Sequence, residues 1–182
     1  LLRIDLAEEA IRLTRIVVTL SDSIESGDSV DIGEVHGLLA LELFHRSRFD
    51  ARADDAGDLV TLDDQDRRRW DRAMIAEARD VLRAAVARPG VGPYRIQALI
   101  AGIHARAATS DDTDWGAIVD LYRILERMRP GPVVALNRAI AVGMAVGPQR
   151  GLDDLDAIDG LGRYHLWHAA RAEMLVRLGR DD

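Results

Sequence analysis

"ALNRAIAVGMAVG" (residues 135–147) and "HAARAEMLVRLGR" (residues 168–180) align as two versions of one helical segment. The alignment sets Arg138 against Arg171, which follows it by 33 residues. Tetratricopeptide (TPR) repeats have a period of about 34 residues, and each repeat is a helix pair that buries its apolar face against its neighbour. The two segments therefore predict TPR-like stacked helix pairs.

The rest of the chain has the same helical periodicity, and alternating runs of Val, Ile and Thr are almost absent. The sequence predicts an all-α fold of about eight helices, over residues 5–20, 31–46, 63–87, 93–107, 114–128, 132–146, 148–158 and 163–178. Three of these helices open with Gly-Pro, where the missing N–H of proline costs nothing: at Pro93, Pro132 and Pro148. A short β-hairpin is expected near residues 51–62, because a turn at 55–57 precedes the β-prone stretch 59–62.

The composition predicts one folded domain over residues 1–182, with 48% hydrophobic residues to build its core. The absence of cysteine excludes disulfides and thiolate metal sites and is compatible with a reducing cytoplasm. A net charge of -7 disfavours direct binding to DNA phosphates. Charged residues interrupt the first twenty residues, which also lack a leader pattern, so we expect a cytoplasmic protein without membrane contact.

The charged stretch "TLDDQDRRRWDRAMIAEARDVL" (residues 61–82) is expected to begin a helix, with Asp63 or Asp64 as its N-cap. Trp70 starts an apolar stripe at three- and four-residue spacing and is expected to be a core anchor. Arg67 extends the same stripe. We therefore expect Arg67 to be partly buried and paired, because an unpaired buried charge is strongly unfavourable. Its partner can be structural or functional.

No pattern in the sequence indicates catalysis. The histidines are His36, His45, His104, His165 and His168. His165 and His168 could share a helix face, but a catalytic zinc site needs a third protein ligand. The sequence also lacks a Gly-rich phosphate loop and a nucleophile paired with a base. We expect no catalytic residue, no bound metal and no cofactor.

Seven motifs carry a family resemblance in order along essentially the whole chain: "DLAEEAIRLTRIV", "EVHGLLALELFHRSR", "LDDQDRRRWDRAMIAEA", "GPYRIQALIAGIHARA", "DTDWGAIVDLYRIL", "PVVALNRAIAVGMAVGP" and "YHLWHAARAEMLVRLGR". This series resembles the C-terminal TPR-like extension of a subgroup of extracytoplasmic-function (ECF) RNA polymerase sigma factors. The sigma regions that precede such an extension are absent here. The chain also stops after the first helix of a repeat, so we expect a fragment that lacks those regions and a final helix.

The resemblance implies a non-enzymatic regulatory and protein-interaction domain that modulates transcription initiation. Its implied partners are its own sigma core regions and RNA polymerase, and promoter DNA only through the absent sigma regions. A concave TPR groove could also hold a peptide or regulatory protein. The alternatives are an all-α small-molecule sensor or enzyme with an Arg/His-lined pocket, and a stand-alone TPR-like scaffold.

Candidate binding residues are the polar side chains embedded in these motifs, because arginine and asparagine can hold carboxylate or backbone groups in a TPR groove. They are His45, Arg46, Arg48, Asp66, Arg67, Trp70, Asp71, Asn137, Arg138, Tyr164, His165, His168 and Arg171. The same residues could instead join one repeat to the next.

Overall fold

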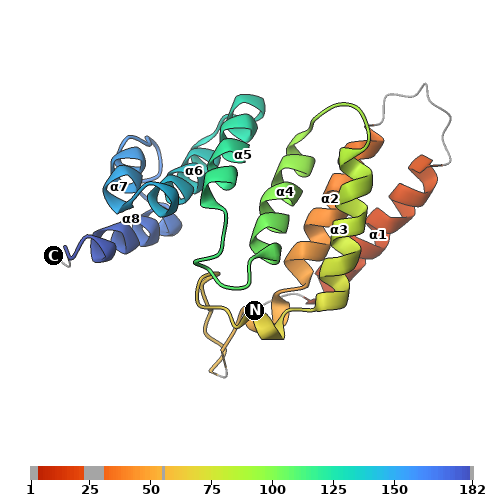
Figure 1. Ribbon diagram of the computed structural model, residues 1–182, viewed down its shortest axis with the longest axis horizontal. Helices are drawn as coiled ribbons and strands as arrows, with labels where there is room; N and C mark the ends of the chain where they lie inside the picture. Colours follow the sequence, from red (N-terminus) through yellow and green to blue (C-terminus); the bar gives the residue numbers. More distant parts are fainter. Residues whose placement is uncertain (1–3, 23–30, 55, 181–182) are drawn as a thin grey trace. The chain divides into compact units, whose positions relative to one another are not determined.

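The computed structural model describes residues 4–22, 31–54 and 56–180. Within these ranges the chain is all-helical, with eight α-helices and two short 3-10 helices, as the sequence predicts (Figure 1). The α-helices are α1 (Ile4–Asp22), α2 (Ile32–Arg46), α3 (Arg72–Val86), α4 (Pro93–Arg106), α5 (Trp115–Met128), α6 (Pro132–Ala145), α7 (Pro148–Asp156) and α8 (His165–Arg177). The 3-10 helices are η1 (Phe49–Ala51) and η2 (Arg67–Arg69). None of the described helices combines the length and apolar character needed to cross a bilayer.

Local side chains determine where many of these helices begin. Three helices start behind an aspartate whose carboxylate accepts a hydrogen bond from a backbone N–H of the first turn: Asp31, Asp71 and Asp114. Three others have proline in the first turn, as predicted: Pro93, Pro132 and Pro148. Each of these aspartates and prolines therefore acts within the first turn of its own helix.

The described residues fall into two compact units, which divide between Thr113 and Asp114. In the first unit, α2 is central and contacts α1, α3 and α4 (Figure 1). Its core gathers apolar side chains from all four helices, with Leu43 and Phe44 of α2 fully buried. Trp70 is 2% exposed and belongs to this core, so the predicted core anchor is confirmed.

In the second unit, each helix packs against the one that follows it, from α5 through α8. The core lies between α6, α7 and α8 and includes Leu136, Leu155 and Met174. α6 and α7 approach closely, because a Cβ atom on Gly151 would lie 2.6 Å from the Cα atom of Gly143. Glycine at these positions lets the two backbones meet.

The predicted helix over 63–87 is wrong in its first part. α3 begins at Arg72, and Asp71 rather than Asp63 or Asp64 caps it, accepting from the Met74 N–H at 2.9 Å. Trp70 has extended backbone angles, φ -75° and ψ 136°, which separate η2 from α3. Trp70 lies at this break, and its indole ring packs into the core.

The predicted β-hairpin near 51–62 is reduced to one isolated antiparallel bridge between Ala53 and Leu59. The chain does turn there, and Gly57 adopts a φ of +88° that favours glycine. Leu59 remains exposed, and Leu62 packs against the core only after the bridge has ended, so the paired residues bury no apolar face. A two-stranded ribbon without such a face is marginal in water.

Candidate functional site

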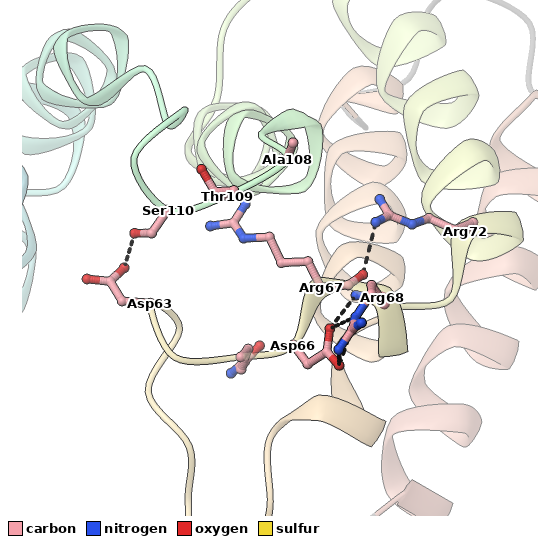
Figure 2. Close-up of a pocket in the computed structure, with 9 residues that line it drawn as sticks. Asp63, Asp66, Arg67, Arg68, Arg72, Ala108, Thr109 and Ser110 are labelled. Carbon is pink, nitrogen blue, oxygen red and sulfur yellow. Dashed lines mark hydrogen bonds and ion pairs between the residues drawn. The ribbon is translucent and has the colours of Figure 1, made fainter.

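A cavity of about 330 Å³ lies beside η2, within the first compact unit (Figure 2). One wall comes from the chain around η2 and the first turn of α3, and the other from the segment that follows α4. Its lining residues are Asp63, Gln65, Asp66, Arg67, Arg68, Arg72, Ala108, Thr109 and Ser110. The volume falls near the lower end of the range found for small-molecule pockets.

Arg67 is the buried cation of this cavity, with 6% of its surface exposed. Its Nη1 donates to the carbonyl oxygens of His104 and Ala107, at 2.7 and 2.9 Å. These carbonyls lie at the C-terminal end of α4, where the helix leaves acceptors unpaired and favours a positive charge. The guanidinium also lies over the Trp70 ring, 4.9 Å from its centroid. Arg67 is therefore buried and paired as predicted, through carbonyls.

One nitrogen of Arg67 is left over. Its Nη2 is buried and has no hydrogen-bond partner among the described residues. Burial lowers the pKa of Arg67, and the negative charges of Asp63 and Asp112 act in the opposite direction. The guanidinium is thus held in place by Nη1 and by Trp70, while Nη2 keeps its donor capacity.

Hydrogen bonds order the rim of the cavity. Asp66 caps η2 and accepts from the backbone N–H and the Nε of Arg68, at 3.0 and 2.9 Å. Ser110 Oγ donates to Asp63 at 2.8 Å, which joins the two walls. Arg72 Nη2 donates to the Arg67 carbonyl at 2.9 Å. Figure 2 shows these contacts around the extended side chain of Arg67.

A second group of predicted residues follows the C-terminal end of α2. Arg48 Nη2 lies 2.8 Å from His45 Nδ1. Arginine can only donate, so the ring of His45 is neutral with its lone pair on Nδ1. Desolvation, followed by the charges of Arg48 and Arg52, lowers the pKa of His45 to about 4, although the residue as a whole is exposed.

Two arginines of this group lie against aromatic rings. The guanidinium of Arg46 lies 5.3 Å from the Phe49 ring centroid, and that of Arg48 lies 5.9 Å from the centroid of Trp70. Such cation–π contacts favour a positive charge next to a ring face. Arg46 also pairs with Glu8 of α1 at 2.9 Å. The structure therefore brings Arg48 and Arg67 to the same indole ring.

The predicted residues of the second unit are distributed over its helix contacts. Arg138 of α6 pairs with Glu126 of α5 at 3.0 Å and with Asp154 of α7 at 3.1 Å, so it joins three helices. Arg171 of α8 pairs with an aspartate of α7. Asn137 is exposed. Arg138 and Arg171, which are 33 residues apart, therefore both join neighbouring helices.

The remaining predicted residues lie at the start of α8. The Tyr164 and His165 rings make an edge contact with centroids 5.6 Å apart. His168 Nε2 lies 2.9 Å from the Gly162 carbonyl oxygen. Across the described ranges, no three His, Asp or Glu side chains are grouped so that they could hold a metal ion. The ring and hydrogen-bond contacts of the two histidines are local to α8 and the turn before it, while Tyr164 also packs against the core of the second unit.

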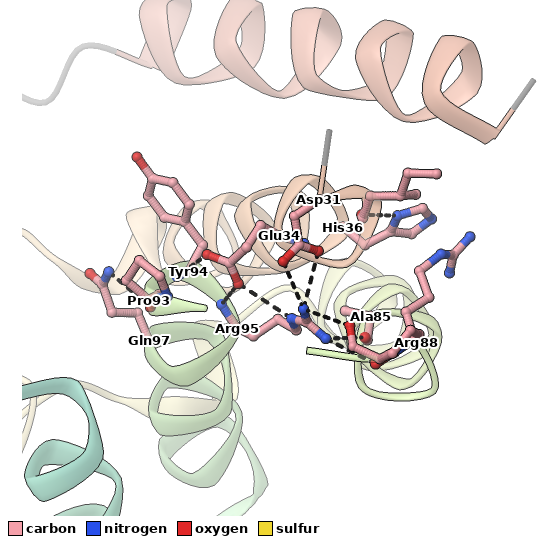
Figure 3. A network of polar contacts seen from close by, with 11 residues as sticks. Asp31, Glu34, His36, Ala85, Arg88, Pro93, Tyr94, Arg95 and Gln97 are labelled. Carbon is pink, nitrogen blue, oxygen red and sulfur yellow. Dashed lines mark hydrogen bonds and ion pairs between the residues drawn. The ribbon is translucent and has the colours of Figure 1, made fainter. Parts of the chain in front are cut away.

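None of the predicted residues belongs to the most extensive polar network, which surrounds Arg95 at the start of α4 (Figure 3). Arg95 is 3% exposed, and its Nη2 lies 3.1 Å from both carboxylate oxygens of Asp31. Its Nε reaches Glu34, and its Nη1 donates to the Ala85 and Arg88 carbonyls at 3.2 and 3.0 Å. One side chain thereby ties together the ends of α2, α3 and α4.

Glycines make room for this network. A Cβ atom on Gly33 would lie 2.8 Å from the Arg95 Cζ, and one on Gly37 would lie 2.8 Å from the Arg95 backbone nitrogen. At Gly92 it would overlap the Glu34 carboxylate. A glycine in the interior of a helix is unfavourable unless packing requires it, and Gly37 is such a glycine in α2. Gly37 was the available signal for a close approach, but it does not identify what approaches.

The family and the relative that are similar to this chain are described without an activity. Residues 1–86 match DUF6596, a family of unknown function, and the match ends at the last residue of α3. An uncharacterized protein of Rhizobium meliloti is 44% identical over 177 residues, which cover 97% of this chain. No solved structure matches. The chain spans 40% of the length of the Rhizobium protein, so it is similar, over nearly all its residues, to one part of a longer protein.

Proposed function

We propose that this chain is a non-enzymatic regulatory and protein-interaction domain of an ECF-type sigma factor, acting in the cytoplasm on transcription initiation. Its partners are the sigma core regions of the same protein and RNA polymerase. The ordered motifs that resemble the sigma-factor extension support this proposal. The greater length of the Rhizobium relative is compatible with further regions beside this one.

The observation that carries this proposal is an exposed apolar stripe on α1, separate from the face of α1 that packs into the core. Ile11 and Val18 pack into the core of the first unit. On another face, four large apolar side chains are each between 45% and 61% exposed: Leu6, Leu13, Val17 and Leu20. Three of the four are seven residues apart, so they follow one line along the helix. Contiguous exposed apolar surface of this kind marks protein contacts.

Regulation then needs no chemistry. A domain that binds one arrangement of the sigma regions better than another shifts the balance between the two by its difference in affinity. An apolar helix face can supply this difference, because its burial depends on which surface the sigma regions present. The result is a change in transcriptional output.

The test is reporter transcription with the full-length protein, alongside thermal melting of each variant. Leu13→Gln removes the middle of the stripe, and Leu59→Gln is the control because that leucine is exposed in the loop after η1. We expect Leu13→Gln to change transcription by about tenfold or less, with an unchanged melting temperature, and Leu59→Gln to match wild type. Wild-type transcription from folded Leu13→Gln, and from a protein without this whole region, would contradict the proposal.

One observation favours a second candidate, a small-molecule sensor. The cavity beside η2 has a buried arginine with unused donor capacity, which a purely structural side chain does not require. The two functions are compatible, since a ligand can be the signal that a regulatory domain receives. The third candidate, a stand-alone scaffold, would be favoured by a gene in which no sigma region accompanies this chain.

A further inference from the structure

Arg67 Nη2 is a buried hydrogen-bond donor that has no acceptor among the described residues. A buried polar group without a partner costs free energy, and the cost is larger for a charged group. Arg67 nevertheless keeps Nη2 buried without an acceptor among the described residues, at a cavity that it helps to line. A ligand atom that accepts from Nη2 would remove this cost.

The guanidinium is also held in position before any ligand arrives. Its Nη1 makes two hydrogen bonds to the end of α4, and its face lies on Trp70, which is itself buried. Immobilising a long side chain is one of the costs of binding a ligand. Because the fold already immobilises the Arg67 side chain, ligand binding does not have to.

The walls define what the ligand can be. Arg67, Arg68 and Arg72 bring positive charge to the cavity, which favours an anion, and a planar carboxylate matches the geometry of a guanidinium. The carboxylates of Asp63 and Asp66 line the same cavity and repel a multiply charged group such as phosphate. A volume of about 330 Å³ suits a small molecule.

We propose that the cavity beside η2 is a binding site for a small monocarboxylate, and that the side chains which cover Arg67 Nη2 move aside so that Nη2 donates to a carboxylate oxygen. Arg72 adds positive charge on the same wall. The site lies within residues 63–110 and does not rest on the sigma-factor proposal. If both hold, occupancy of this cavity is the signal that the domain receives.

The experiment is a titration of the isotope-labelled chain with sodium acetate, followed by two-dimensional ¹H–¹⁵N NMR. Sodium chloride keeps the ionic strength constant, and a parallel titration uses sodium phosphate. We expect saturable shifts for the amides of Ala108, Thr109 and Ser110 and for the Nε–H of Arg67, with weaker binding of phosphate. Saturation separates a site from general screening of surface charge.

Two variants locate the binding. Arg67→Gln should lower the affinity for acetate by about tenfold or more, since a hydrogen bond to a charged group is lost. Because Arg67 also caps α4, the second variant is Ala108→Trp, which fills the cavity from an exposed position. Its matched control is Ala76→Trp, on the exposed face of α3. We expect Ala108→Trp to abolish the saturable shifts and Ala76→Trp to retain them.

Three results would overturn the proposal: no saturable shift with acetate, tighter binding of phosphate than of acetate, or full acetate binding by Ala108→Trp. None of them bears on the α1 stripe, whose test is transcription by the full-length protein. Conversely, wild-type transcription from Leu13→Gln leaves the acetate titration as an independent result.

Discussion

Arg95 and Arg67 are both almost fully buried in the first compact unit, yet they are used differently. Every guanidinium nitrogen of Arg95 has an acceptor, and two carboxylates balance its charge. Arg67 has two carbonyl acceptors, one nitrogen without a partner and a cavity beside it. The difference shows that burial alone does not separate a structural arginine from a candidate binding residue. The completeness of its hydrogen bonds does.

The largest effect is expected from Arg95→Ala. This change leaves two carboxylates and several helix-end carbonyls without their partner and opens a cavity, so it should destabilise the chain by about 3 to 5 kcal/mol. Denaturant unfolding measures it. Arg83→Ala is the control, because Arg83 makes an exposed pair with Asp80, and this variant should stay within about 0.5 kcal/mol of wild type. A loss below about 1 kcal/mol for Arg95→Ala would remove its structural role.

A smaller loss is expected from Arg67→Gln. The change removes two charged hydrogen bonds to the end of α4, but it also relieves a buried donor without a partner, so we expect about 1 to 2 kcal/mol. The same unfolding experiment measures it beside Arg95→Ala. If Arg67→Gln proves as destabilising as Arg95→Ala, Arg67 is as important for stability as Arg95, and the two arginines do not differ in role.

The smallest effect concerns pH. Burial, followed by the charges of Arg48 and Arg67, lowers the pKa of His104 from 6.5 to about 4. The unfolded chain therefore binds more protons between these values, so the stability contribution is complete above about pH 6.5 and is lost as the pH falls towards 4. Because His104 is only partly buried, we expect a total loss of about 1 kcal/mol or less across this window. His104→Gln should reduce the slope and leave the part that comes from His45, whose pKa is lowered in the same way. An unchanged slope would exclude His104 as a source.

Much of the fold could be predicted because its signals are local. The predicted helix over 114–128 begins where Asp114 caps it, accepting from the Ala117 N–H at 3.0 Å. The apolar spacing placed Trp70 in the core, where it lies. The helix start near residue 63 was wrong because Asp71 and the extended backbone of Trp70 compete with helix propensity over 63–70. Several acids near one another left the choice of cap to tertiary packing.

The candidate site was predicted only in part. The stripe pattern indicated that Arg67 is buried, but not which atoms it contacts. Its acceptors belong to His104 and Ala107, 37 and 40 residues away. Nothing near Arg67 in the sequence encodes the end of α4, and the cavity exists only because the two segments meet there.

The sequence by itself determined the all-α class, the Gly-Pro helix starts and the burial of Trp70, because each depends on residues within one or two helical turns. Only the tertiary structure decided that Arg95 joins Asp31 and Glu34, which precede it by 64 and 61 residues. It also decided that Arg67 keeps a donor unused. Hydrogen-bond partners of buried charges are chosen by packing across the chain, and periodicity along one helix carries no information about them.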